Sequence, residues 1–485
     1  MVDWTSKGER LLFSRIDIAW LVAFRVMFGL LVAWDAWRYV WSGTIAEHFV
    51  TPPLLLKFAG FEWVTRMGAF GMNAVYVGMV VTGLAIAAGL FYRAACVGFF
   101  FLHTYIFLVA AEYYLNHAYL ISVLSLLMAT LPAHRAASLD VRRRPEIHTR
   151  EVHQWPWVLL IGVLGVVYTY GAIAKMNPDW LAAEPVRHWL RWRAEAASDA
   201  WVRRVLIDER FVFLIAYGGL FFDLLVVPGM LWRRTRPLFV LLSMGFHLTN
   251  AFLFNIGVFP WLMIAATTMF FDRDWPRRVP GYRETFSSAI DTWGTEEDAA
   301  PTDPLAGAPR ARIVYGLSAF FTVMLLLPLR HHLYPGDVAW NEEGHNYSWR
   351  MKLRDKQGRF TYRIVDRNNG ERWRVDPREQ LTPRQYRKAC ARPMFAIQYA
   401  HYLRDAYRTE GREVSIYADH FVSLNYRPAR RLFDPEVDLA AVERNLFAPD
   451  PWITPFPGDP LPSPAIALRR ELSPRVRQLT ARVAR

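Results

Sequence analysis

A series of long apolar segments occupies the first 330 residues of the chain. A helix needs about 20 mostly apolar residues to cross a membrane. About nine segments approach that requirement: Ile16–Val40, Met72–Leu90, Ala95–Ala111, Leu120–Leu131, Trp157–Ala174, Phe211–Leu231, Pro237–Phe254, Val258–Phe271 and Ile313–Leu329. Aromatic residues make up 15% of the chain and include 20 Trp, a high share for a soluble domain. We therefore predict an all-α polytopic membrane bundle of about nine transmembrane helices.

Much of the excess basic charge lies in short loops between these segments. The Arg-rich loops are Ser138–Arg150, Leu231–Pro237 and Asp272–Arg283. Short basic loops stay on the cytoplasmic side, and nine spans with a cytoplasmic N-terminus place all three there. The first ten residues are too polar to begin a cleavable signal, so we expect the first span to be retained. The pattern predicts a protein of the inner (cytoplasmic) membrane whose residues after about Leu329 are extracytoplasmic, and the net charge of +13 does not indicate a nucleic-acid partner.

The composition changes near residue 331 to that of a soluble domain. Phe360–Asp376 alternates apolar and polar residues around Asn369-Gly370, which predicts a β-hairpin. Thr382–Arg408 begins with a Thr cap and a Pro and is mainly helical in pattern, with a kink or break expected at Pro393. Glu413–Pro428 resembles a strand. We predict a transmembrane domain at 1–330, a small extracytoplasmic α+β domain at 331–447, and a Pro/Arg-rich C-terminal tail at 448–485 that wraps or frays.

Several polar side chains lie within or beside the apolar segments, where they are costly and often functional. Three sets stand out: Lys175 in Gly171–Trp180, the pair Asn116 and His117 in Tyr113–Leu120, and His247 followed by Asn250 and Asn255. The predicted topology places all of them towards the outer half of the bundle. Each also has a structural explanation. A lysine at a helix end can extend to the interface, a buried histidine can be a packing residue, and Asn-His can cap a helix.

Other classes of site have no motif in this sequence. It contains no HExxH, no CxxC pair, no Gly-rich phosphate loop and no Gly-x-Ser-x-Gly elbow. His331 and His332 are adjacent rather than spaced for a metal site on one helix face. We therefore expect no metal, and hydrolase, kinase and zinc-enzyme functions are not indicated.

An ordered set of short segments resembles the vitamin K-dependent γ-glutamyl carboxylases and their bacterial relatives, which share a horizontally transferred transmembrane (HTTM) domain. The similarity covers roughly residues 12–445. It is carried by Leu21–Arg38, Gly89–Phe100, Tyr113–Leu120, Ala174–Leu181, Phe246–Ala265, Trp340–Leu353, Gln398–Leu403 and Arg431–Leu439. Single segments are ordinary membrane sequence, whereas the ordered set is specific.

The resemblance implies an enzyme that couples epoxidation of reduced vitamin K by O2 to removal of the γ-proton of a protein glutamate and addition of CO2. The cofactor would be menaquinol or phylloquinol hydroquinone, and the partners a Glu-containing protein or peptide and membrane lipids. Lys175 corresponds to the amine that deprotonates the hydroquinone. Asn116 and His117 correspond to the pair that orients the quinone oxygen, and His247 to the family's intramembrane histidine.

The Trp-x8-Trp segment resembles the family's glutamate-binding region, which implies substrate contacts at Trp340, Tyr347, Ser348 and Trp349. Ordinary aromatic packing is the alternative. The sequence after Trp349 lacks the histidine expected shortly downstream, and it ends soon after Leu439, without the further domain of the animal enzymes. Two other functions therefore stay open: a quinol oxygenase or epoxidase that does not carboxylate protein, and a non-catalytic membrane module that binds quinone or lipid.

Overall fold

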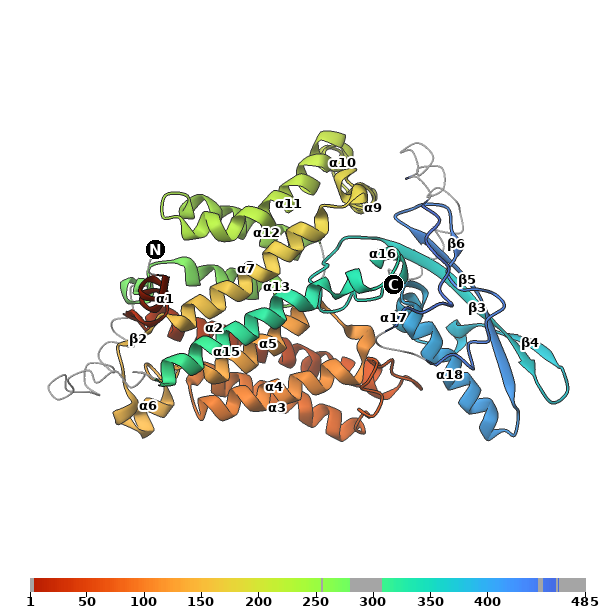
Figure 1. Ribbon diagram of the computed structural model, residues 1–485, viewed down its shortest axis with the longest axis horizontal. Helices are drawn as coiled ribbons and strands as arrows, with labels where there is room; N and C mark the ends of the chain where they lie inside the picture. Colours follow the sequence, from red (N-terminus) through yellow and green to blue (C-terminus); the bar gives the residue numbers. More distant parts are fainter. Residues whose placement is uncertain (1–3, 254–255, 280–307, 444–447, 459–460, 462–485) are drawn as a thin grey trace. The chain divides into compact units, whose positions relative to one another are not determined.

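The computed structural model describes residues 4–253, 256–279, 308–443, 448–458 and 461 (Figure 1). The chain divides into two compact units. The first unit combines Met1–Ile173 with Gly218–Leu329, and the second combines Ala174–Tyr217 with Arg330–Arg485. Each unit is described separately below.

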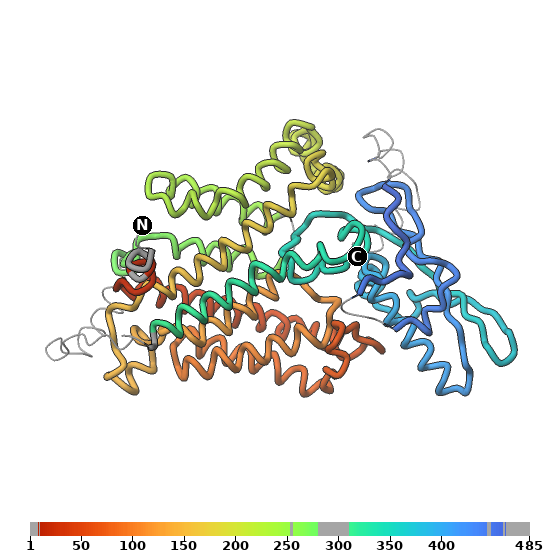
Figure 2. The backbone as a smooth tube through the Cα atoms, in the orientation of Figure 1, coloured from red at the N-terminus to blue at the C-terminus, as the bar shows by residue number. Residues whose placement is uncertain are grey.

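The first unit is helical, and the path of its chain can be followed in Figure 2. Its helices are α1 (Trp4–Phe13), α2 (Ala19–Ser42), α3 (Ala69–Ala88), α4 (Tyr92–Val109), α5 (Asn116–Thr130), α6 (Leu139–Arg143), α7 (Trp155–Lys175), α11 (Glu209–Leu231), α12 (Arg236–Leu253), α13 (Phe259–Thr267) and α15 (Ala308–Leu326), of which α7 and α11 continue into the second unit. Short turns of 3-10 or π helix are η1 (Ala46–Val50), η2 (Ala111–Tyr113), η3 (Pro145–Ile147), η4 (Thr268–Phe270), η5 (Trp275–Arg278) and η7 (Leu327–Leu333). Strands β1 (Arg15–Asp17) and β2 (Glu151–His153) form an antiparallel pair.

Six described helices are long and apolar enough to cross a membrane: Ala19–Ser42, Ala69–Ala88, Tyr92–Val109, Trp155–Lys175, Glu209–Leu231 and Arg310–Leu333. The prediction of a helical membrane bundle is confirmed, but the number nine is not. Two of the predicted segments form shorter apolar helices, Asn116–Thr130 and Phe259–Phe270, which fall below the length of a bilayer crossing. A third predicted segment, Pro237–Phe254, corresponds to helix α12, which is not among the six candidate spans. This helix includes Arg236, His247 and Asn250, which lower its mean hydropathy.

Helices α2 and α3 approach closely because glycines face each other's backbones. A Cβ atom placed on Gly29 would lie 2.5 Å from the backbone nitrogen of Ala87, and one on Gly83 would lie 3.0 Å from the Cβ of Ala33. Small residues at such crossings allow helix backbones to pack tightly in a membrane. Arg25 on α2 is buried and donates to the backbone carbonyls of Ala133 (2.7 Å) and Ala137 (2.6 Å). These hydrogen bonds connect α2 to the loop after α5.

The second unit contains a four-stranded antiparallel sheet with the order β4-β3-β5-β6. The strands are β3 (Lys356–Asp366), β4 (Arg372–Val375), β5 (Val414–Leu424) and β6 (Arg430–Arg431). The helices of this unit are α8 (Pro178–Leu181), α9 (Val186–Ala196), α10 (Ala200–Ile207), α16 (Val338–Asn341), η8 (Pro377–Glu379), α17 (Pro383–Ala391) and α18 (Pro393–Thr409). Figure 1 shows α17 and α18 beside the sheet. The predicted α+β character of this part of the chain is confirmed.

Three local predictions for this unit, the β-hairpin, the helix cap and the break at Pro393, are confirmed. The β3–β4 hairpin pairs Tyr362 with Val375, as the Asn-Gly signal predicted. Thr382 and Gln385 form a capping box at the start of α17, which satisfies two backbone groups that a helix start leaves unpaired. The helix ends at Ala391 and a new one begins at Pro393, because proline cannot continue the hydrogen-bond pattern of the preceding turn.

The beginning of the C-terminal tail packs rather than frays. Ile453 forms an antiparallel bridge with Phe433, and Trp452 is buried. The ring of Phe456 lies 5.3 Å from that of Trp340. The apolar side chains at 452, 453 and 456 therefore give this Pro-rich segment packing partners within the α+β unit.

Candidate functional site

His247 lies on α12 in an aromatic part of the first unit. It is 1% exposed, and its Nε2 atom is 2.9 Å from the hydroxyl of Tyr168. Its ring packs against Phe246 (5.3 Å), Phe222 (6.0 Å) and Phe259 (6.1 Å). Within the described residues, the other nitrogen, Nδ1, has no hydrogen-bond partner. A buried polar atom of this kind is costly unless something pairs with it.

The pair Asn116 and His117 begins α5. The His117 ring stacks on Phe259 at 5.4 Å, and the Oδ1 atom of Asn116 accepts a 2.9 Å hydrogen bond from Tyr114. His117 and His247 therefore contact the same aromatic ring, although 130 positions separate them in the sequence. The structure brings these two predicted residues together through Phe259, a residue that sequence reasoning did not select.

The two asparagines after His247 have different outcomes. Asn250 lies on α12 three residues after His247 and is half-buried, so it follows by about one helical turn. Asn255 lies outside the described residues.

Lys175 is the last residue of α7 and belongs to the second unit. Its side chain is buried, with 7% exposed, and its Nζ atom lies 5.4 Å from the centroid of the Trp180 ring. The helix ends here because Asn177 caps α8: its Oδ1 atom accepts from the backbone nitrogen of Trp180 (3.0 Å). The Asn177 amide also donates to the carbonyl of Ala174 (2.8 Å). The lysine is thus held in the interior beside an indole rather than extended to water.

Asp179 anchors this segment within the second unit. Its carboxylate accepts two hydrogen bonds from Arg427, at 2.6 and 2.7 Å, and one from the Asn425 amide at 2.6 Å. The Trp180 indole donates to the carbonyl of Ala216 (2.9 Å). Sequence reasoning missed Asp179, although its position in the Lys-x-x-x-Asp-Trp segment was a signal.

The residues predicted to bind glutamate lie mostly in the interior of the second unit. Trp340 is 2% and Trp349 1% exposed, and the Trp340 indole donates to the carbonyl of Thr454 (2.7 Å). Ser348 is buried and donates to the carbonyl of His345 (2.5 Å). The burial is what the packing alternative predicts for the two indoles, and a substrate contact of Tyr347 and Ser348 stays a prediction.

A partly buried basic cluster, Arg354, Lys356, Lys388 and Arg392, lies in the same unit. Lys356 is 3.6 Å from a Glu342 carboxylate oxygen and donates to the carbonyl of Trp340. Arg354 donates to Glu342 through Nε (2.8 Å) and Nη2. Burial lowers the pKa of Lys356 to about 8; Glu342 opposes this shift and the nearby guanidinium groups add to it. Burial, followed by the charges of Arg392, Arg384 and Arg354, also lowers the pKa of Lys388.

The charge balance of this cluster favours an anion. Four cationic side chains surround one carboxylate, that of Glu342. His345 is buried beside Arg354, at 3.2 Å, and its Nδ1 atom has no partner among the described residues. Burial, reinforced by the adjacent arginines, holds the pKa of His345 well below its usual range. A carboxylate that entered here would relieve the mutual repulsion of the cations. Arg354 and Lys356 belong to the basic stretch Arg-Met-Lys-Leu-Arg-Asp-Lys in the sequence, but their convergence with Lys388 and Arg392 was not visible there.

No group of three or more His, Cys, Asp or Glu side chains that could hold a metal ion occurs within the described residues. Sequence comparison gives two matches. The model of the HTTM domain matches residues 13–275, and the model of the lumenal domain of vitamin K-dependent gamma-carboxylase matches residues 310–459. No solved structure matches the chain.

Proposed function

The chain belongs to the vitamin K-dependent gamma-carboxylase family, and from this premise we propose that it is a quinol-dependent γ-glutamyl carboxylase of proteins or peptides. It is a membrane protein with an extracytoplasmic C-terminal domain. The observation that carries the proposal is the match of both family domains, in order, to one chain. The bacterial inner membrane, a cytoplasmic N-terminus and menaquinol as the natural quinol complete the proposal.

The aromatic surroundings of His247 fit a quinone. Phe222, Phe246 and Phe259 provide apolar rings, which suit the flat apolar face of a quinone. The unpartnered Nδ1 atom of His247 can exchange a hydrogen bond with a quinone oxygen. In the proposal His247 and the stacked His117 hold the ring, with Asn116, Asn250 and Asn255 as polar support.

The bound hydroquinone, with O2, supplies a base stronger than any side chain. The protein's part is to bind, orient and move one proton. In the proposal the Lys175 amine accepts the hydroquinone proton, for which it must be neutral and shielded from bulk water. Its 7% exposure supports the shielding that this role requires. Asn116 and His117 orient the oxygen that loses the proton.

The basic cluster supports recognition of the substrate glutamate. Burial lowers the pKa of the Lys356 and Lys388 amines, and a bound carboxylate anion favours their charged form. In the proposal these amines and Arg354 receive the γ-carboxylate, and Trp340, Tyr347, Ser348 and Trp349 shape the surroundings. Addition of CO2 creates a second carboxylate, which the excess of cations over Glu342 also accommodates.

The test uses purified protein in nanodiscs with vitamin K hydroquinone, O2, labelled bicarbonate and a Glu-rich peptide. We expect epoxide and labelled peptide from the native chain. In Lys175→Ala we expect the rates of formation of the epoxide and of the labelled peptide to fall at least about 100-fold. Removal of a general base lowers a reaction rate by about 10²–10⁴-fold. Lys175→Arg keeps the charge but cannot accept a proton at neutral pH, so it should be equally inactive. Lys57→Ala, which removes a hydrogen bond to Val109, is the control and should stay active.

The outcomes separate the alternatives. Epoxide without labelled peptide would replace the carboxylase with a quinol epoxidase. Absence of both products from the native chain would leave a non-catalytic module that binds quinone or lipid. Activity that persists in Lys175→Ala would remove the lysine from the mechanism.

A further inference from the structure

Helix α10 of the second unit carries apolar side chains that the protein does not cover. Six of its eight residues are apolar, with the sequence Ala-Trp-Val-Arg-Arg-Val-Leu-Ile, and none is buried. Trp201 is 70% exposed, Ile207 47% and Val202 37%. Apolar side chains exposed side by side in this way indicate a partner.

The next helix shows where this surface lies. Only Asp208 separates the end of α10 from α11, which is one of the six helices able to cross a membrane. The first turns of α11 expose Phe213 and Leu214, at 40% and 65%. Because the start of a membrane span lies at the membrane surface, α10 must lie within one residue of that surface. The α10 segment belongs to the same unit as the extracytoplasmic domain, so the surface is that of the outer leaflet.

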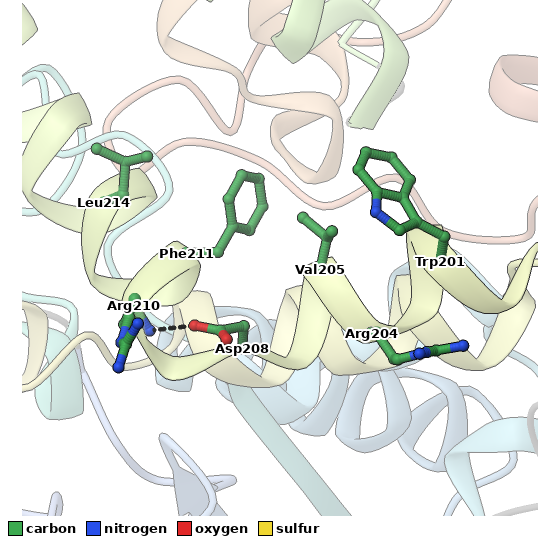
Figure 3. Close-up of a pocket in the computed structure, with 7 residues that line it drawn as sticks. All are labelled: Trp201, Arg204, Val205, Asp208, Arg210, Phe211 and Leu214. Carbon is green, nitrogen blue, oxygen red and sulfur yellow. Dashed lines mark hydrogen bonds between the residues drawn. The ribbon is translucent and has the colours of Figure 1, made fainter.

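The bend between α10 and α11 forms an open groove of about 490 Å³. Figure 3 shows Trp201, Val205, Phe211 and Leu214 projecting to one side of the two helices. Arg204 and Arg210 lie on the other side, towards opposite ends of the segment, with Asp208 between them. The arrangement is therefore apolar along one side and carries two guanidinium groups and one carboxylate along the other.

The two arginines are available to an anion. Both are exposed, and neither side chain forms an ion pair or hydrogen bond with another described residue. Asp208 lies between them, and its carboxylate accepts a hydrogen bond from the backbone nitrogen of Arg210 (2.8 Å). A phosphate suits each of these guanidinium groups, because a guanidinium presents several donors in one plane.

We propose that α10 lies in the plane of the outer leaflet and that Arg204 and Arg210 bind phosphates of bilayer phospholipids, whose acyl chains cover Trp201, Val205, Phe211 and Leu214. Tryptophan is enriched at this depth of a membrane, with its ring at the headgroup level. An in-plane helix is stabilised there by burial of its apolar side chains and by attraction to anionic lipid. The lipid supplies both the apolar and the anionic partner that the groove lacks.

Anchoring of α10 in the outer leaflet also fixes how deep the segment that contains Lys175 lies relative to the membrane surface. Ala216 on α11 accepts from the indole of Trp180, and the hydroxyl of Tyr217 donates to the carbonyl of Leu181 (3.0 Å). Arg187 on α9 donates to Glu209, the first residue of α11, at 2.9 Å. The lipid-bound α10 and the start of α11 thus belong to one hydrogen-bonded body with α8 and α9. The inference does not depend on the proposed carboxylation.

The experiment places a nitroxide label at Val205→Cys in the full chain in nanodiscs of phosphatidylglycerol and phosphatidylcholine. The native Cys96 and Cys390 are both buried, and protein without the added cysteine serves as the labelling blank. We expect the label to be accessible to O2 and shielded from a water-soluble nickel reagent. The double variant Arg204→Glu/Arg210→Glu should reverse that preference and retain about 25-fold less phosphatidylglycerol after detergent purification. Each arginine near an anionic surface contributes about a factor of five.

The matched control is Arg374→Glu, which reverses an exposed arginine on β4. It should leave the label and the retained lipid unchanged, and gel filtration should show that all variants fold. A label that is open to the nickel reagent in the native background would overturn the proposal. Retained lipid that is unaffected by the double variant would do the same, as would displacement of the lipid by millimolar inorganic phosphate.

Discussion

At the scale of single residues, the most informative contact is the one between Asp179 and Arg427, which are 248 positions apart. Both side chains are largely buried, at 17% and 9% exposed. Two hydrogen bonds to one guanidinium fix the carboxylate in both distance and angle. Asp179 adjoins Trp180, whose ring lies beside the Lys175 amine. We therefore expect the ion pair to act as a positioning contact for the lysine.

We expect Asp179→Asn to destabilise the second unit by about 3 kcal/mol, because one partner of a largely buried ion pair is left uncompensated. Urea unfolding followed by tryptophan fluorescence measures the loss. The proposed activity should fall in kcat, with the KM for the quinol unchanged. Asp376→Asn is the control, since its partner Arg378 is 61% exposed and exposed pairs contribute about 0–1 kcal/mol. Equal effects of the two substitutions would contradict the positioning role.

Lys356 gives a prediction about pH. Its pKa is lowered by burial to about 8, below the usual 10.5. Between these values the unfolded chain holds a proton that the folded chain has lost, so the lysine's contribution to stability increases with pH across this window. Below about pH 8 the amine is charged in both states and its burial penalty is fully present. Substrate binding has the opposite dependence, because only the charged amine attracts a carboxylate.

We therefore expect the KM for a Glu-containing peptide to rise by up to about tenfold between pH 8 and 9, the limit for one titrating group. Steady-state kinetics at several pH values measures it. Lys356→Arg keeps the charge throughout this range and should flatten the profile. A KM that rises equally in both proteins would show that another group titrates.

At the scale of elements, sequence patterns predicted those features that neighbouring residues determine. The hairpin at Asn369-Gly370, the Thr382 cap and the break before Pro393 all depend on the conformational preferences of a few adjacent residues. Helices α9 and α10 were not predicted, because one is Arg-rich and the other is shorter than any span. Their amphipathic pattern over eight to eleven residues was the available signal.

The crossing of α2 and α3 gives a prediction at this scale. We expect Gly29→Ala to lower the free energy of unfolding by about 1–3 kcal/mol, because the new methyl group meets the backbone of α3. The control is Gly165→Ala on α7, where nothing lies within 4 Å of the added carbon. That substitution should be neutral or stabilising, since alanine favours helix more than glycine. Thermal unfolding in detergent compares the two, and a stable Gly29→Ala protein would contradict the close crossing.

At the scale of the whole molecule, hydropathy predicted the class of protein, whereas the predicted number of spans is not confirmed. The Leu120–Leu131 and Val258–Phe271 segments are apolar, yet the helices they form are shorter than the six candidate spans and below the length of a bilayer crossing. Hydropathy measures the partition of a segment between water and an apolar medium. It does not distinguish lipid from the interior of a helical bundle, because both are apolar.

The sequence by itself determined the membrane bundle, the α+β unit, the hairpin, the helix caps and the family, because these depend on local periodicity and on ordered motifs. Only the tertiary structure decided the burial of Lys175 beside Trp180, the shared contact of His117 and His247 with Phe259, and the gathering of basic side chains around Glu342. These features join residues that are far apart in the chain or depend on what surrounds a side chain. Pattern within one segment carries no information about which distant segment packs against it.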